Sequence, residues 1–142
     1  MVKFSSSFFD KEILFIGFNE KEKWFCMQVY QSLTKKGLTV HPVTGERKDT
    51  FAIPMFGSID EAPKTPRCAY VITDIGETAR MIEPLHGRGI RKILFNSKNV
   101  ADEAILKKCE SLGIETSMGC PLMAYGGGFH RFHGFIAGVK KA

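Results

Sequence analysis

The sequence predicts a doubly wound α/β domain, with a sheet of about five mainly parallel strands and helices on both of its faces. Short apolar runs alternate along the chain with segments whose apolar residues recur every three or four positions. The runs are continuously apolar, as expected of parallel strands buried on both faces. Strands that alternate with helices are joined by right-handed crossovers, which favours a doubly wound sheet. We expect a single domain over residues 1–142, with its core at 11–123 and a tail at 124–142.

The first half of the chain predicts two strands and two helices. Residues 11–18 (KEILFIGF) form the first apolar run. The helix that follows has apolar positions four residues apart: Phe25, Val29 and Leu33. It ends at Gly37, and residues 38–43 (LTVHPV) predict the second strand. Ser58 and Glu61 have the spacing of a capping box, which predicts the start of a short helix.

The second half continues the alternation. Residues 68–73 (CAYVIT) predict the third strand and residues 78–86 a helix. Residues 93–96 predict the fourth strand. A helix capped by Asn99 is then expected to run to Leu112, before a fifth strand at 114–118.

The tail departs from this alternation. Residues 120–128 (CPLMAYGGG) predict a turn or loop. Beyond them apolar residues recur at three- and four-residue steps: Phe129, Phe132, Ile136 and Val139. We expect an amphipathic helix docked on the domain, with a helix that binds a partner or forms a homodimer as the alternative. His130 and His133 share a face of this helix, but no other clear ligand accompanies them, so we predict no metal site.

Composition and charge indicate an ordinary globular protein. The chain has 142 residues, of which 44% are hydrophobic and 25% charged, and its net charge is +5. Lysine and arginine are scattered along the chain, which favours a local phosphate site over a nucleic-acid-binding face. No stretch approaches the roughly 18 apolar residues of a membrane span, and the N-terminal apolar run is too short for a secretory signal. The four cysteines lack metal-ligand spacing. We expect reduced thiols and a cytoplasmic protein.

The loops after the strands are the expected ligand site, because open parallel sheets bind ligands outside the carboxyl ends of their strands. These loops span residues 17–24, 43–48, 73–77 and 96–99. Gly17 allows a sharp turn and a close approach by phosphate, and the next helix offers unpaired N–H groups. Asn19 adds a donor, Lys21 and Lys23 add charge, and Trp24 ends this phosphate-binding loop. A tight turn with no ligand remains the alternative.

The loop is not that of a Rossmann-like NAD dehydrogenase. It reads GFNEKEKW and lacks the fingerprint G-x-G-x-x-G. The second strand ends in Pro42, Val43 and Thr44, where an acidic residue would hold a ribose hydroxyl. Arg47 and Lys48 follow instead, and these fit an additional phosphate on the ribose, with solvated loop charges as the alternative.

Four motifs over residues 13–123 together resemble a known family. They are ILFIGFN, LTVHPV, FGSIDEAP and GIETSMGCP, in this order. They resemble motifs of the stand-alone CoA-binding domain proteins, which are related in fold to the nucleotide-binding domain of succinyl-CoA synthetase α subunits. The resemblance implies a Rossmann-like fold and coenzyme A or an acyl-CoA as ligand.

The resemblance also implies positions for the ligand. Gly17, Phe18 and Asn19 would meet the pyrophosphate, and Val43 and Thr44 would border the adenosine. The rest of the crevice would be lined by Thr73, Asp74 and Asn96. Cys120 matches the cysteine of the family.

No catalytic constellation is evident, so we expect non-catalytic binding of a small-molecule nucleotide. Asp74 and Glu77 follow a strand, but Asp74 is equally suited to cap the next helix. Cys120 is a structural thiol unless nearby cations depress its pKa. Two alternatives stay open: an NADP(H)- or other nucleotide-dependent redox enzyme or sensor, and a ligand-free interaction module that uses the Phe-rich tail.

Overall fold

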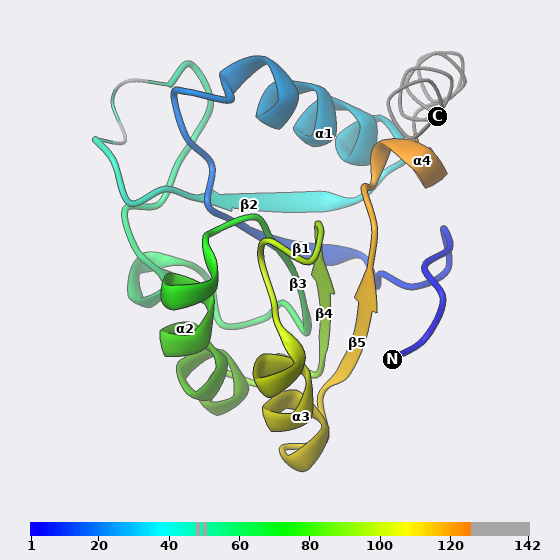
Figure 1. Ribbon diagram of the computed structural model, residues 1–142. Coiled ribbons are helices and arrows are strands. Elements are labelled where there is room, and N and C mark those ends of the chain that lie inside the picture. Colours follow the sequence, from blue (N-terminus) through cyan, green and yellow to red (C-terminus); the bar gives the residue numbers. More distant parts are fainter. Residues whose placement is uncertain (48, 50, 126–142) are drawn as a thin grey trace.

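Five parallel strands form one sheet in the computed structural model, which describes residues 1–47, 49 and 51–125 (Figure 1). The strands are β1 (Glu12–Ile16), β2 (Thr39–Val43), β3 (Cys68–Val71), β4 (Lys92–Phe95) and β5 (Glu115–Met118). Their order across the sheet is β2-β1-β3-β4-β5, and every pair of neighbours is parallel. The predicted parallel α/β sheet is confirmed.

A single bridge extends the sheet beyond β2. Phe56 pairs in parallel with Val43: its N–H donates to the Pro42 carbonyl at 2.9 Å, and its own carbonyl accepts from the Thr44 N–H at 2.9 Å. If Phe56 is counted as a strand, the order across the sheet becomes 3-2-1-4-5-6, which is the Rossmann order. The order reverses between β1 and β3, and ligands bind above this reversal in such sheets.

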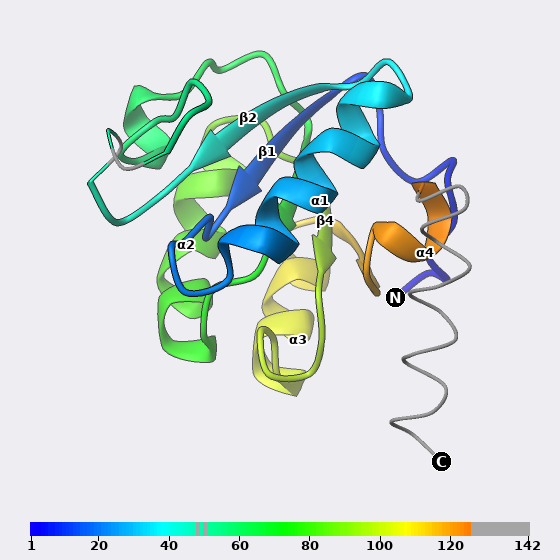
Figure 2. The same ribbon diagram turned by 90° about the horizontal axis from the view of Figure 1, so that it is seen from above.

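Helices cover both faces of the sheet, as predicted (Figures 1 and 2). They are α1 (Lys23–Lys35), α2 (Ile75–Gly87), α3 (Glu103–Ser111) and the single-turn α4 (Leu122–Tyr125). Successive strand residues point to opposite faces. Leu14 and Ile16 therefore pack in the cluster that includes α2 and α3, whereas Ile13 and Phe15 pack in the cluster that includes α1 and α4.

Two helices begin elsewhere than the sequence suggested. α2 begins at Ile75, because the Asp74 carboxylate accepts the Glu77 N–H at 2.8 Å and caps the helix. α3 begins at Glu103 and is capped by Asp102 in the same way, through the Ile105 N–H at 3.0 Å. The predicted cap at Asn99 is wrong. The residues after it, 100–101, are buried in the core before the helix begins.

Two further local predictions need correction. The segment that begins at Ser58 is only a 3-10 turn, η2 (Ile59–Glu61), and the Ser58 side chain makes no capping hydrogen bond, so the capping box does not form. The segment expected as a loop after β5 contains α4, whose Leu122 and Tyr125 side chains are buried beside α1. Burial of two apolar side chains on one face stabilises this short turn of helix.

The capping aspartates allow a direct test of helix stability. Asp102→Ala should lower the free energy of unfolding by about 1 kcal/mol, because it leaves the Ile105 N–H without its partner. Asp102→Asn keeps a capping oxygen and should cost much less. Urea denaturation followed by circular dichroism would measure both variants, and equal losses would show that the cap contributes nothing specific.

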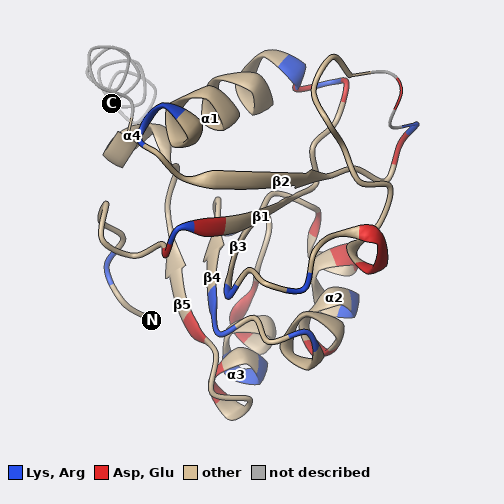
Figure 3. Ribbon diagram, turned by 180° about the vertical axis from the view of Figure 1, so that it is seen from behind, with Lys and Arg blue, Asp and Glu red and all other residues tan. Residues whose placement is uncertain are grey.

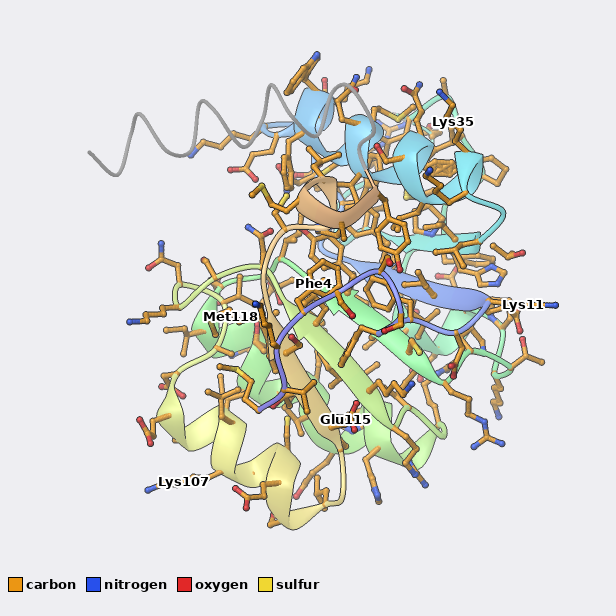
Figure 4. The ribbon with its side chains drawn as sticks, turned by 90° about the vertical axis from the view of Figure 1, so that its right-hand side faces the viewer. Phe4, Lys11, Lys35, Lys107, Glu115 and Met118 are labelled. Carbon is orange, nitrogen blue, oxygen red and sulfur yellow. The ribbon has the colours of Figure 1, made fainter. Side chains whose placement is uncertain are left out.

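The N-terminal segment is part of the core, which begins upstream of residue 11. The Val2 N–H donates to the Thr116 carbonyl at 2.8 Å, and the Ser117 hydroxyl donates to the Val2 carbonyl at 2.7 Å, so this segment runs beside β5 (Figure 4). Four aromatic rings then pack together with centroids 5.5–6.4 Å apart: Phe4, Phe8, Phe9 and Tyr125. The segment thereby shields the edge of β5.

Several expectations fall on residues 126–142, outside the described part of the chain: the amphipathic tail helix, its role in a homodimer, and His130 with His133. None of the helices in the described ranges has the length and apolarity needed to span a bilayer. Lysine and arginine are spread over several elements in the described part (Figure 3).

Candidate functional site

A cavity of about 890 Å³ lies at the carboxyl ends of β1, β2 and β3. It is lined by residues 16–19, 21–22, 43–46, 57–60 and 72–74, and by Glu77, Arg80, Met81 and Pro84 of α2. Its volume is within the range of small-molecule sites. The cavity therefore lies beside the β1–β3 strand-order reversal, which is where this fold places its ligands.

Gly17 allows the chain after β1 to pack closely against the residues that follow β3. Its φ of +105° is in the region that favours glycine. A Cβ at this position would lie 2.8 Å from Ile72 Cγ1 and 3.1 Å from the Thr73 backbone nitrogen. The Gly17 and Phe18 N–H groups both donate to the Val43 carbonyl, at 3.0 and 3.2 Å. These two amides are thus engaged with β2, whereas the sequence-based expectation presented this turn to a pyrophosphate.

The Asn19 side chain closes the turn that follows. Its amide nitrogen donates to the Gly17 carbonyl at 2.9 Å, and its oxygen accepts the Glu22 N–H at 2.8 Å. Phe18 is fully buried against the rings of Phe15 and Phe51, which anchors the loop to the core. The β1–α1 loop is therefore held by its own hydrogen bonds and by packing against the core.

The start of α1 differs from the starts of α2 and α3. Its N-cap residue, Glu22, makes no side-chain capping bond, and no acidic residue lies in the first turn. The partial positive charge of a helix N-terminus is therefore not offset there by a capping carboxylate. Lys21 lines the cavity beside this helix start.

Carboxylates outnumber cations in the cavity wall. The cations are Lys21 and Arg80. The acidic residues are Glu22, Glu46, Asp60, Asp74 and Glu77. Within the described residues, Lys21 and Arg80 form no ion pair with any of these carboxylates. The cavity wall is therefore acidic, although the chain as a whole has a net positive charge.

Thr73 and Asp74 line the wall at the end of β3 and the start of α2. The Thr73 hydroxyl is 2.8 Å from the hydroxyl of Thr78, which is buried and also donates to the Asp74 carbonyl at 2.8 Å. Asp74 uses one carboxylate oxygen to cap α2. Both residues are thus held in place by the first turn of the helix.

Just over half of the predicted ligand-binding residues line the cavity, and the others lie outside it. Those in the wall are Gly17, Phe18, Asn19, Val43, Thr44, Thr73 and Asp74. Those outside it are Lys23, Trp24, Pro42, Arg47, Asn96 and Cys120.

Five of the residues outside the wall lie on the first turn of α1, in or beyond β2, or after β4. Lys23 and Trp24 are exposed on the first turn of α1. Pro42 is buried inside β2, and the Asn96 side chain accepts a hydrogen bond of 2.7 Å from the Tyr70 hydroxyl. The Arg47 guanidinium is 84% exposed and pairs at 2.9 Å with Asp49, while Lys48 lies outside the described residues.

Sequence reasoning missed several residues of the wall, including Glu46, Arg80 and the segment 57–60. Arg80 had a detectable signal, because Glu77, Arg80 and Pro84 recur at helical spacing on the face of α2 that meets the cavity. Segment 57–60 belongs to the motif FGSIDEAP, but the motif did not show that the segment lines the cavity, because its place beside β2 depends on the bridge at Phe56.

The cysteines are not activated thiols. All four are free, and burial raises the pKa of Cys26, Cys68 and Cys109 to about 11. Burial also raises the pKa of Cys120, against the opposing effect of nearby backbone N–H groups. A raised pKa keeps a thiol protonated and unreactive. No group of three or more potential metal ligands occurs within residues 1–47, 49 and 51–125.

The sheet order and the cavity define a Rossmann-type α/β domain with a ligand-sized site at its strand ends. A family model described as a CoA-binding domain matches residues 11–126. The chain therefore belongs to the CoA-binding domain family. A search of curated proteins found no match.

Solved structures with the same fold have low sequence identity. A conserved hypothetical protein from Pyrococcus furiosus is similar with a TM-score of 0.64 and 20% identity, over 78% of this chain and 94% of that chain. Prb, a protein redesigned for binding, has a TM-score of 0.68 and 16% identity, over 78% of each chain. The Thermus thermophilus protein called cell-free ID.343 has a TM-score of 0.64 and 16% identity, over 78% and 84%. At this identity the likeness establishes the fold alone.

Proposed function

We propose that this protein binds coenzyme A or an acyl-CoA in the cavity at the carboxyl ends of β1, β2 and β3. One observation carries the proposal: in a chain of the CoA-binding domain family, a ligand-sized cavity lies at the strand-order reversal. That reversal is where sheets of this kind bind nucleotides.

The diphosphate of the ligand would lie near the start of α1. The side chain of the N-cap residue Glu22 makes no capping hydrogen bond there, and the N-terminal end of a helix favours an anion. Lys21 adds a cation in the same part of the wall. Val43 and Thr44 would border the adenosine, and the apolar parts of Ile59, Met81 and Pro84 would face the remainder of the ligand.

The role proposed is binding without a reaction. Cys120 is the thiol that could exchange with a disulfide of coenzyme A, and its raised pKa disfavours the thiolate that such exchange requires. Four free cysteines also fit a reducing compartment, which supports the cytoplasm as the location.

Isothermal titration calorimetry with coenzyme A and acetyl-CoA would test the proposal. Binding in the micromolar range with one ligand per chain is the expected result. Failure of both ligands to bind at millimolar concentration would refute the proposal.

Lys21→Ala should weaken coenzyme A binding about three- to tenfold, because it removes the cation beside the diphosphate. The effect should shrink at high salt, because Lys21 is exposed and its interactions are screened. Lys107→Ala on α3 is a matched control, since Lys107 is an exposed lysine outside the wall (Figure 4). Equal effects of the two substitutions would place the diphosphate elsewhere.

A further inference from the structure

Glu46 occupies a position that the sequence does not reveal. It lies three residues beyond the end of β2, and its N–H donates to the Thr44 hydroxyl at 3.0 Å. Thr44 itself is buried, so this turn is anchored to the sheet. The turn directs the Glu46 carboxylate across to the β1–α1 loop, where its Oε1 accepts the Glu20 N–H at 2.9 Å.

This contact brings an acidic group to the loop that a nucleotide would approach. In the Rossmann fold, an acidic residue after the second strand accepts hydrogen bonds from the ribose hydroxyls. β2 does not end in an acidic residue. The turn at Thr44 instead brings Glu46, three residues beyond the end of β2, to this position. Glu46 lines the same cavity as Gly17 and Asn19.

Among the described residues, which do not include Lys48, the cavity wall around Glu46 offers few cations to compensate a phosphate on that ribose. The nearest predicted partner, Arg47, is directed to Asp49 and lies outside the wall. Asp60 also lines the wall. Figure 3 shows acidic residues in the loops beyond the carboxyl end of β2 and near the start of α2. A ribose phosphate placed at this end of β2 would therefore meet like charge at short range.

We infer that Glu46 selects ligands whose adenosine ribose carries free hydroxyls and disfavours those with a phosphate on that ribose. The inference rests on the proposed function and sets its specificity: dephospho-CoA should bind more tightly than coenzyme A. The Glu46 carboxylate accepts hydrogen bonds from the two hydroxyls, and the extra phosphate replaces one hydroxyl donor by an anion. On this inference Arg47, which the sequence suggested for that phosphate, stays paired with Asp49.

Titration calorimetry with dephospho-CoA and coenzyme A at fixed ionic strength tests the inference, because the two ligands differ only by this phosphate. The wild-type protein should bind dephospho-CoA about tenfold more tightly. Glu46→Gln keeps an oxygen for the Glu20 N–H and removes the charge. In this variant the ratio should fall towards one, mainly through tighter binding of coenzyme A.

Glu115→Gln is the matched control, because it makes the same change in net charge at an exposed residue that begins β5 and does not line the cavity (Figure 4). Its ratio should equal that of the wild type. The inference is overturned if the wild type binds coenzyme A as tightly as dephospho-CoA, or if Glu46→Gln leaves the ratio unchanged. Failure of both ligands to bind would instead refute the proposed function and the inference together.

Discussion

Raising the pH from 9 to 11 should sharply destabilise the protein. Burial raises the pKa of three thiols, Cys26, Cys68 and Cys109, from 9.0 to about 11. Above pH 9 these thiols lose protons in the unfolded chain but keep them in the folded protein, so the unfolded state gains stability. The free energy of unfolding is therefore unaffected by these groups below pH 9 and falls as the pH rises towards 11.

The expected loss is on the order of 1 kcal/mol per pH unit for each thiol within this window. Three thiols together give several kcal/mol, which is a large part of the stability of a typical domain. Urea denaturation at pH 8, 9, 10 and 11 in the presence of a reductant would measure the effect.

A triple alanine variant of these cysteines provides the control. Its stability should depend much less on pH between 9 and 10. Some loss should persist above pH 10, because Tyr70 is fully buried and its pKa is raised well above 10.0. An undiminished slope between pH 9 and 10 in this variant would show that other groups cause the alkaline unfolding.

Gly17→Ala should destabilise the protein by about 3 kcal/mol or more. The new side chain would be strained at a φ of +105°, would overlap Ile72 and would lie tightly against the Thr73 backbone beyond the carboxyl end of β3. Gly37→Ala separates these two causes. Gly37 has a comparable φ of +90°, but a Cβ there would meet no atom within 4 Å.

Gly37→Ala should therefore cost only the conformational strain, about 1 to 2 kcal/mol. Thermal and urea unfolding of both variants would give the difference, which is expected to be at least 1 kcal/mol. Equal losses would mean that the sheet end relaxes around an alanine and that the close approach of β1 and β3 is not required.

The order of strands and helices could be predicted because it depends on the local spacing of apolar residues. Phe25, Val29 and Leu33 recur at helical spacing, and the apolar runs at 12–16 and 92–95 have no polar interruption. Helix starts were less certain, because several capping residues compete. Asn99 and Asp102 are both good caps, and burial of the residues between them decided in favour of Asp102.

Seven of the 21 residues in the cavity wall were among the predicted ligand-binding residues, for a general reason. The carboxyl ends of parallel strands meet at one edge of the sheet, so Gly17, Val43 and Thr73 had to lie close together once the sheet was parallel. Glu46 and Gly57 were not named as site residues, although they lie in the expected ligand loop 43–48 and in the motif FGSIDEAP, because the path of the chain between them depends on the bridge at Phe56.

The sequence by itself determined the parallel sheet, the helices on its two faces and the family to which the chain belongs, because each of these depends on short-range patterns. Only the tertiary structure decided the charge around the cavity. It directs Arg47 to Asp49 and brings the Glu46 carboxylate to the amide of Glu20, 26 residues away. Such contacts depend on the conformation of loops. Packing against the rest of the sheet sets that conformation, and no local sequence pattern predicts it.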